Sequence, residues 1–372
     1  MALYSLGNIL FVGLPKAASV ALLFIIGWSV AHEPGLEDRY ADALLIIAVA
    51  ELATSGLQPL SIHRYKLTQR LPSIALPLVG FTLMLSLYFS HEIDLAQIFL
   101  GLAVPTAKLL SAQLLASARY FSSSFWYQFS LMCFFFEYVQ FGTFYCVVAY
   151  VVGVIWILRL TYDTRVEDDV RFLLAIAPQH FYARLLAWGV PAYLAAQGLP
   201  GEAAILQLFH RASAVFSMPA SVLATISMPN KVQSIAFSEK DLLHELLLTL
   251  IFSSAFLTTI FLSQYVFKVD DLIHLGADEI VSNIPIMATY VFGLLSGLNV
   301  CVLGYLNLND SLRRADIYVY ATLVLGIIIF FYSREDVGFY INVYILMSAL
   351  LLVSSLIRVA GAWRRNKIVE SQ

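Results

Sequence analysis

The sequence predicts an all-α polytopic membrane protein with about twelve transmembrane helices, in two six-helix lobes around a central cavity. Three observations predict this class. Long apolar segments recur along the whole chain, their connecting loops alternate in positive charge, and one long polar stretch lies near the middle. Hydrophobic residues make up 60% of the chain and aromatic residues 14%, which is more apolar than a soluble globular domain.

Each apolar segment is long enough to cross a bilayer as a helix, because backbone inside lipid must satisfy its own hydrogen bonds. The fifth and sixth segments are nearly fused, and the seventh is interrupted by Pro191. The predicted spans cover residues 8–31, 40–62, 71–90, 95–118, 123–141, 142–160, 180–198, 203–228, 244–265, 283–307, 315–332 and 337–359.

Positive charge between the spans is strongly asymmetric. The loops after even-numbered spans and the C-terminal tail hold 16 Lys and Arg residues, whereas the loops after odd-numbered spans hold 3. The positive-inside rule therefore places both termini and the even-numbered loops in the cytoplasm. Residues 16–31 look like a signal peptide, but apolar residues precede Lys16 and cleavage would leave an odd number of spans, so we expect this segment to be retained.

The polar stretch at residues 159–182 divides the chain into halves of equal span number, as parallel repeats require. Within it, Asp168 and Asp169 lack the spacing of a magnesium motif for prenyl diphosphates, and we expect them to be solvated. The predicted domains are an N-terminal six-helix lobe (1–160), a cytoplasmic amphipathic linker (161–183) and a C-terminal six-helix lobe with a short cytoplasmic tail (184–372).

Five ionisable residues lie deep inside predicted spans: Lys16, Glu51, Lys108, His210 and Arg211. A charge at bilayer depth costs several kcal/mol unless it faces water, a partner or a ligand. We therefore expect these residues to line the cavity, and their mainly positive charge should attract anions. The candidate substrate-binding residues are Lys16, Lys108, His210 and Arg211, with Glu51 as a gate or ion-coupling residue.

Other interpretations of the same residues stay open. Lys16 and Lys108 could extend along their helices to the inner interface. Arg211 and Glu51 could form a purely structural pair. His210 could be a hydrogen-bonded core histidine, and Glu51 could bind a proton or sodium ion.

Catalytic and metal-binding patterns give no positive signal. The chain has no GxSxG, HExxH or P-loop motif, and its three cysteines all fall within spans without a CxxC pair. We therefore expect no enzyme activity, no cofactor, no metal site and no nucleic-acid partner. The acidic outer loop at residues 266–282 is expected to be a surface segment.

Three segments carry a family resemblance. They are residues 201–219, with a small-residue stripe and Pro219, residues 267–280 with His274-Leu275-Gly276, and the basic turn at 306–314. Together with the two-lobed layout, they resemble the multidrug/oligosaccharidyl-lipid/polysaccharide exporter superfamily, and within it the O-antigen and exopolysaccharide flippase branch.

This resemblance implies a flippase that moves an undecaprenyl-pyrophosphate-linked oligosaccharide across the bacterial inner membrane by alternating access. Its expected partners are that lipid-linked oligosaccharide, membrane lipid, and a glycan polymerase with other proteins of the assembly pathway. A pyrophosphate needs cationic partners to leave water. We expect Lys16 and Lys108 to meet it first and Arg211 to take it as the cavity opens outward, with Glu51 pairing with Arg211 in one state.

Two other functions remain. An ion-coupled exporter of drugs or small molecules would use Glu51 as its coupling site. A membrane-embedded enzyme of glycan assembly is the second alternative, although such an enzyme would be expected to carry a sizeable outer loop with catalytic Arg or His, and the longest outer loop here has only Lys268 and His274.

Overall fold

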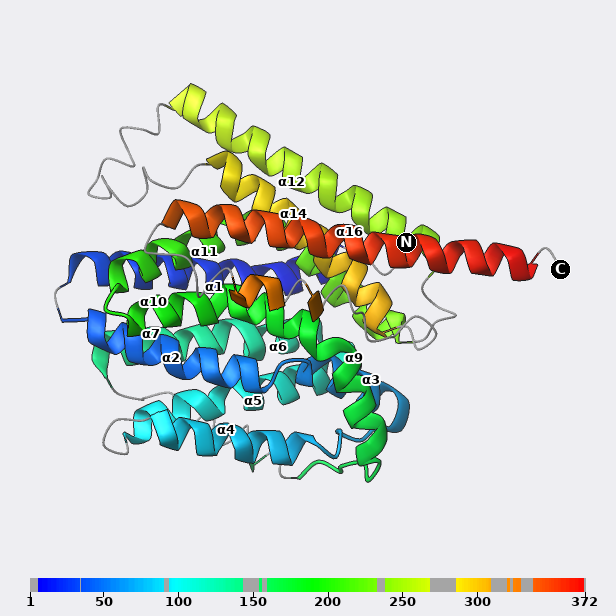
Figure 1. The fold of residues 1–372 in the computed structure, drawn as a ribbon, viewed down its shortest axis with the longest axis horizontal. Helices are drawn as coiled ribbons and strands as arrows, with labels where there is room; N and C mark the ends of the chain where they lie inside the picture. The colour runs from blue at the N-terminus through cyan, green and yellow to red at the C-terminus, as the bar shows by residue number, and fades with distance from the viewer. Residues whose placement is uncertain are drawn as a thin grey trace. The chain divides into compact units, whose positions relative to one another are not determined.

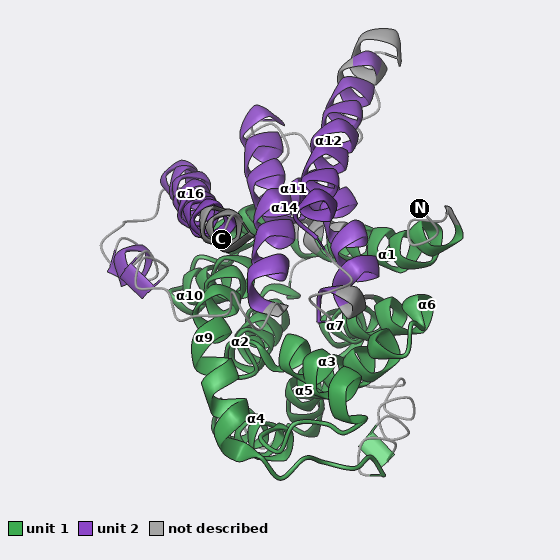
Figure 2. Cartoon of the chain, turned by 90° about the vertical axis from the view of Figure 1, so that its right-hand side faces the viewer, with its two compact units in different colours: residues 1–207, 313–316 green, residues 208–312, 317–372 purple. Residues whose placement is uncertain are grey.

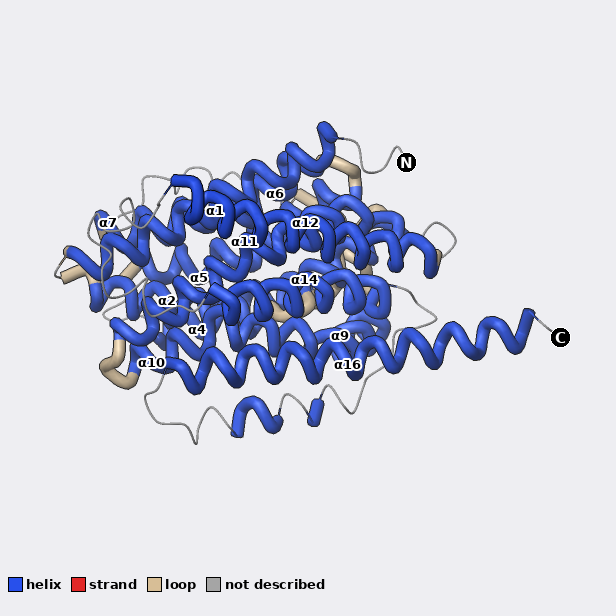
Figure 3. Tube along the Cα trace, turned by 90° about the horizontal axis from the view of Figure 1, so that it is seen from above, coloured by secondary structure: helices blue, strands red, loops and turns tan. Residues whose placement is uncertain are grey.

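The computed structural model describes residues 6–33, 35–89, 94–142, 154–155, 159–232, 238–267, 286–308, 320–321, 324–328 and 337–370. In these ranges the named elements are all helices (Figure 3). Contacts divide the chain into two compact units (Figure 2). Unit 1 comprises residues 1–207 and 313–316, and unit 2 comprises residues 208–312 and 317–372.

Unit 1 is built around α5, which contacts α2, α3, α4, α6 and α7 and is mostly buried. Its apolar side chains pack with those of α3 and the start of α4 in one core cluster. The α-helices are labelled in Figure 1, and the π-helical segments η3 and η4 lie between them. The helices are α1 (Leu6–His32), α2 (Glu37–Ala53), α3 (Leu57–Thr68), α4 (Ala75–Phe89), α5 (Leu95–Ala116), α6 (Tyr120–Ser124), η3 (Phe125–Ser130), α7 (Leu131–Phe141), α9 (Val166–Arg184), η4 (Leu185–Gly189), α10 (Val190–Ala196) and the start of α11 (Pro200–Lys231).

The second predicted span is two helices, α2 and α3, which meet at an angle of 44°. Pro59 explains the break, because it has no N–H to donate to the carbonyl of Ser55 one turn earlier. The chain turns at Gly56, whose φ of +81° favours glycine. The hydroxyl of Thr54 donates to the carbonyl of Ala50, which satisfies backbone at the end of α2.

The seventh predicted span is also irregular, but it is continuous with the segment before it. The chain runs from α9 through the π-helical segment η4 into α10. Pro191 cannot donate to the carbonyl of Ala187, and the side chain of Gln207 donates to that carbonyl instead at 2.6 Å. The irregularity that we predicted at Pro191 therefore lies one turn earlier, and α11 supplies the missing hydrogen bond.

The predicted linker, residues 161–183, is helical from Val166 and packs within unit 1. Phe172 and Ile176 of α9 are buried against Leu60 of α3, whereas Leu174 is exposed. The units defined by contacts divide within α11 rather than at this segment. The six-plus-six repeat remains a prediction, because a contact division does not test it.

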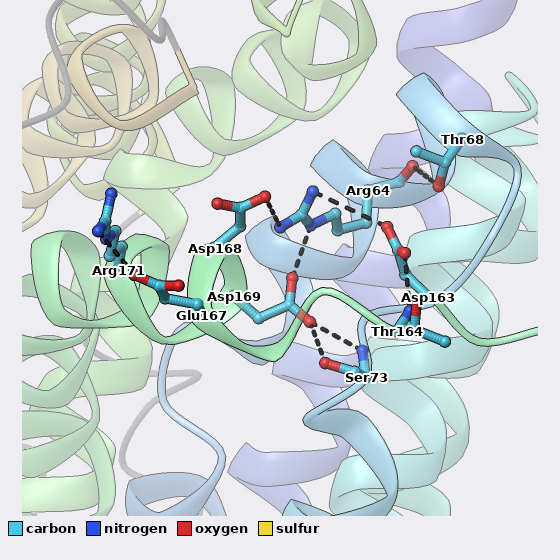
Figure 4. Close-up of polar contacts among 9 residues, drawn as sticks. All are labelled: Arg64, Thr68, Ser73, Asp163, Thr164, Glu167, Asp168, Asp169 and Arg171. Atoms are coloured by element: carbon cyan, nitrogen blue, oxygen red, sulfur yellow. Dashed lines mark hydrogen bonds and ion pairs between the residues drawn. The ribbon is translucent and has the colours of Figure 1, made fainter.

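Polar contacts fix the start of α9 to α3 and to the turn before α4 (Figure 4). Asp169 is fully buried; one carboxylate oxygen accepts from Arg64 Nε at 2.6 Å, and the other accepts from the backbone N–H and hydroxyl of Ser73 at 2.8 Å. Arg64 also lies 3.9 Å from Asp163 and 3.6 Å from Asp168. The expectation that Asp169 is solvated was wrong, because it neutralises a buried arginine; Asp168 is half-exposed.

Unit 2 contains most of α11 together with α12 (Glu239–Phe267), α14 (Ile286–Leu308) and α16 (Val337–Glu370). α14 contacts both α12 and α16. It also lies very close to α11, because a Cβ atom added at Gly293 would be 2.3 Å from the carbonyl oxygen of Ser213. Small residues at such positions let membrane helices approach closely.

The described helices have the composition of membrane spans. Four of them are long and apolar enough to cross a bilayer, or five if the bent pair α2 and α3 counts as one span. Large apolar side chains are exposed along α12, including Leu247, Ile251 and Phe256, as expected for a helix surface in contact with lipid. Most of the sixth and eleventh predicted spans, the outer loop at 266–282 and much of the basic turn at 306–314 lie outside the described residues.

Candidate functional site

A buried ion pair lies at the centre of unit 1. Glu51, in the last turn of α2, is 1% exposed, and its Oε2 is 2.7 Å from the Nζ of Lys108 on α5. Lys108 Nζ also donates to the hydroxyl of Thr54 at 2.7 Å and lies within 3.4 Å of the backbone carbonyls of Glu51 and Thr54. The α2–α3 break thus supplies the oxygen atoms that hold this ammonium group.

A second cation binds the same carboxylate. Arg184, the last residue of α9, places Nε 3.2 Å from Oε2 of Glu51. Its Nη2 donates to the hydroxyl of Tyr127, and its guanidinium carbon lies 5.7 Å from the centre of the Tyr127 ring. The Arg184 side chain is 29% exposed, whereas those of Lys108 and Glu51 are 3% and 2% exposed.

Three helix irregularities meet at this cluster, which we define as Glu51, Lys108, Arg184 and Tyr127. Glu51 is close to the break between α2 and α3, Arg184 directly precedes η4, and Tyr127 lies within η3. π-Helical segments are rare and occur frequently at functional sites. The cluster therefore lies where helices depart from regular geometry, as functional sites often do.

The formal charges of the cluster do not cancel, because two cations share one carboxylate. Buried charge is stable only when it is paired, so an excess of cations favours a negatively charged ligand. The same two cations oppose a metal ion at Glu51. Among the described residues, no group of three or more His, Cys, Asp or Glu side chains could hold a metal.

The structure brings together two of the residues singled out from the sequence, Glu51 and Lys108. Lys108 does not extend to the interface, since its ammonium group is bound at Glu51 and Thr54. Lys16 is also buried in unit 1, at 5% exposure, on α1 directly after Pro15. The roles of Lys16 and Lys108 in substrate binding remain predictions.

His210 and Arg211 lie on the part of α11 that belongs to unit 2. The His210 ring is 5.7 Å from the ring of Phe292 in an edge-on contact, so this histidine takes part in aromatic packing. The predicted pair between Glu51 and Arg211 joins residues of different units and remains a prediction. Within unit 1, Glu51 contacts Lys108 and Arg184.

Besides Arg64, sequence reasoning missed two cations of internal ion pairs, because it counted both with the cytoplasmic loops. Arg184 lies in the cluster, and Lys231, at the end of α11, lies 2.8 Å from Glu245 of α12. The Lys231 and Glu245 side chains are 1% and 0% exposed. For Lys231, the only signal in the sequence was its partner Glu245, an acidic residue just inside the predicted ninth span.

Comparisons with known proteins identify the fold. No protein-family model matches the sequence, and no curated protein matches it. A crystal structure of a MATE protein carrying a point substitution is similar, with a TM-score of 0.50 and 10% sequence identity over 98% of this chain and 97% of that chain. The chain is therefore an all-α polytopic membrane protein with the fold of that MATE protein.

Proposed function

We propose that this chain is an exporter that moves an undecaprenyl-pyrophosphate-linked oligosaccharide from the inner to the outer leaflet by alternating access, for O-antigen or exopolysaccharide synthesis. In this proposal the protein lies in the bacterial inner membrane with both termini in the cytoplasm. Its partners are membrane lipid and the proteins of glycan assembly, including a polymerase. The lipid-linked sugar crosses without any change in its covalent structure.

The observation that carries the substrate class is the cationic excess of the buried cluster. Lys108 and Arg184 share the single carboxylate of Glu51, and Arg184 is partly exposed. A pyrophosphate group cannot enter hydrocarbon without cationic partners, and a guanidinium can bind two of its oxygens at once. The cluster therefore suits an anionic headgroup better than a cationic drug.

A flipping assay tests this proposal. The purified chain is placed in vesicles that contain an undecaprenyl-pyrophosphate-linked oligosaccharide, and an impermeant glycosidase measures the sugar that reaches the outer leaflet. We expect Arg184→Gln to slow flipping at least about tenfold, because one buried charge-assisted contact contributes on the order of 1.5–3 kcal/mol. Arg171→Gln is the control, since Arg171 is exposed and pairs only locally with Glu167. Flipping no faster than in protein-free vesicles would refute the proposal.

An ion-coupled exporter of drugs or small molecules is the second candidate. The structural likeness to a MATE protein supports it at least as well as it supports a flippase. Uptake of a fluorescent cation, driven by a pH gradient across vesicles and lost in Glu51→Gln, would favour it. The contacts of Glu51 with two cations oppose this role, since a bound cation would have to displace both.

A further inference from the structure

We infer that Glu51 is an internal substitute for the anion of the substrate: its carboxylate occupies Arg184 at rest, and a phosphate or pyrophosphate group replaces it there. The binding site consists of Arg184 and Tyr127. This inference deepens the proposed function, since it names the headgroup site and gives Glu51 a role other than ion coupling.

The unequal exposure of the two cations indicates which one meets a ligand. Lys108 is almost completely buried, and its donors are directed to Glu51 and Thr54. Arg184 is 29% exposed and holds Glu51 through Nε and Tyr127 through Nη2. An arriving anion can therefore reach the guanidinium of Arg184 without entering the core around Lys108.

Exchange at Arg184 leaves the Glu51 carboxylate paired with a cation. When Arg184 turns to an external anion, Glu51 keeps its contact of 2.7 Å with Lys108, so the carboxylate remains neutralised. A buried carboxylate that lost its only cation would carry a large penalty, which a second cation removes. Arg184 then pairs with the incoming anion instead of with Glu51.

Tyr127 positions the guanidinium for this exchange. Its hydroxyl accepts from Arg184 Nη2 and its ring lies beside the guanidinium carbon, so Arg184 stays oriented when it leaves Glu51. Both residues are next to or inside π-helical segments, which occur frequently at functional sites.

Binding measurements on the full chain in detergent micelles test the inference, with inorganic pyrophosphate as the probe. If Glu51 competes for Arg184, Glu51→Gln should bind pyrophosphate about tenfold more tightly, which lies within the usual range of coupling between sites. Arg184→Gln should bind at least about tenfold more weakly. If Glu51 has only a structural role, Glu51→Gln should bind pyrophosphate no more tightly than the parent chain.

A second variant keeps the test interpretable if Glu51→Gln fails to fold. Glu51→Gln leaves Lys108 without its carboxylate, whereas Glu51→Gln combined with Lys108→Met removes both partners and avoids an unpaired buried charge. The double variant should also bind pyrophosphate more tightly than the parent chain. The matched control is Lys231→Met with Glu245→Gln, which removes the buried pair of unit 2 and should leave the affinity unchanged.

The outcomes separate this inference from the proposed function. Unchanged affinity in the folded double variant, or unchanged affinity in Arg184→Gln, overturns the inference. Farnesyl pyrophosphate provides the second arm: tighter binding than inorganic pyrophosphate supports a lipid headgroup as the ligand. If farnesyl pyrophosphate and inorganic pyrophosphate bind equally well, the Arg184 site is supported with a free anion as its ligand. That result counts against the lipid-linked substrate but not against the exchange between Glu51 and the anion.

Discussion

The ion pair of unit 2 gives a prediction with an unusually clear magnitude. Lys231 and Glu245 are separated by 2.8 Å, and their side chains are 1% and 0% exposed. Replacing Lys231 with Met removes the cation but keeps a side chain of similar length. The carboxylate of Glu245 then stays buried without the ammonium that balances it.

The expected cost is large because the remaining charge cannot reach water. Removing one member of a buried pair typically costs about 3–5 kcal/mol, whereas replacing both members is often neutral. We therefore expect Lys231→Met to lower the free energy of unfolding by about 3–5 kcal/mol. Adding Glu245→Gln to the same chain should restore most of that loss.

The free energy of unfolding is measured in mixed micelles by titration with a denaturing detergent, monitored by circular dichroism. Arg171→Gln serves as a control, since the pair of Arg171 and Glu167 is exposed and such pairs contribute about 0.3–0.5 kcal/mol. If Lys231→Met costs no more than this control, or if the double variant is no more stable than the single one, the reasoning from burial is wrong.

Three further predictions concern stability. Asp169→Asn should lower the free energy of unfolding by about 2 kcal/mol, measured by the same titration, because Arg64 loses its shortest charge-assisted contact. Gly293→Ala should cost about 1–3 kcal/mol by the same method, because its Cβ would lie 2.3 Å from the carbonyl oxygen of Ser213. In the loop before α9, burial raises the pKa of Tyr162 to about 12. The unfolded chain ionises this tyrosine near pH 10, so stability should fall as pH rises from about 10 to 12, and Tyr162→Phe should flatten thermal unfolding temperatures across that range.

The class of the fold was predictable because lipid imposes a simple rule on composition. Apolar length predicts the spans, and the fold class is confirmed by the helices and by the MATE likeness. Proline gave useful signals, since the irregular geometry near Pro59 and Pro191 follows from their missing N–H groups. Each irregularity lies several residues before the proline, because the affected carbonyl is one turn earlier.

The partners in the site were not predictable from one sequence. Glu51 and Lys108 are 57 positions apart, and Arg184 is far from both. Their contact depends on how the helices pack against one another, and the hydrophobic periodicity of a sequence does not predict that packing. Charges near the ends of apolar segments are especially misleading. Arg184 and Lys231 both lie near predicted span boundaries, yet each contacts a buried carboxylate inside its unit.

The contacts between Arg64 and Asp169 have a practical consequence for spectroscopy. They join α3 to α9 together with the apolar contact of Leu60 and Phe172, so we expect the two helices to move together. Spin labels or fluorophores on the exposed Leu67 and Leu174 should therefore keep a constant separation under every ligand condition. This pair of labels provides a reference distance with which distance changes elsewhere in the chain can be compared.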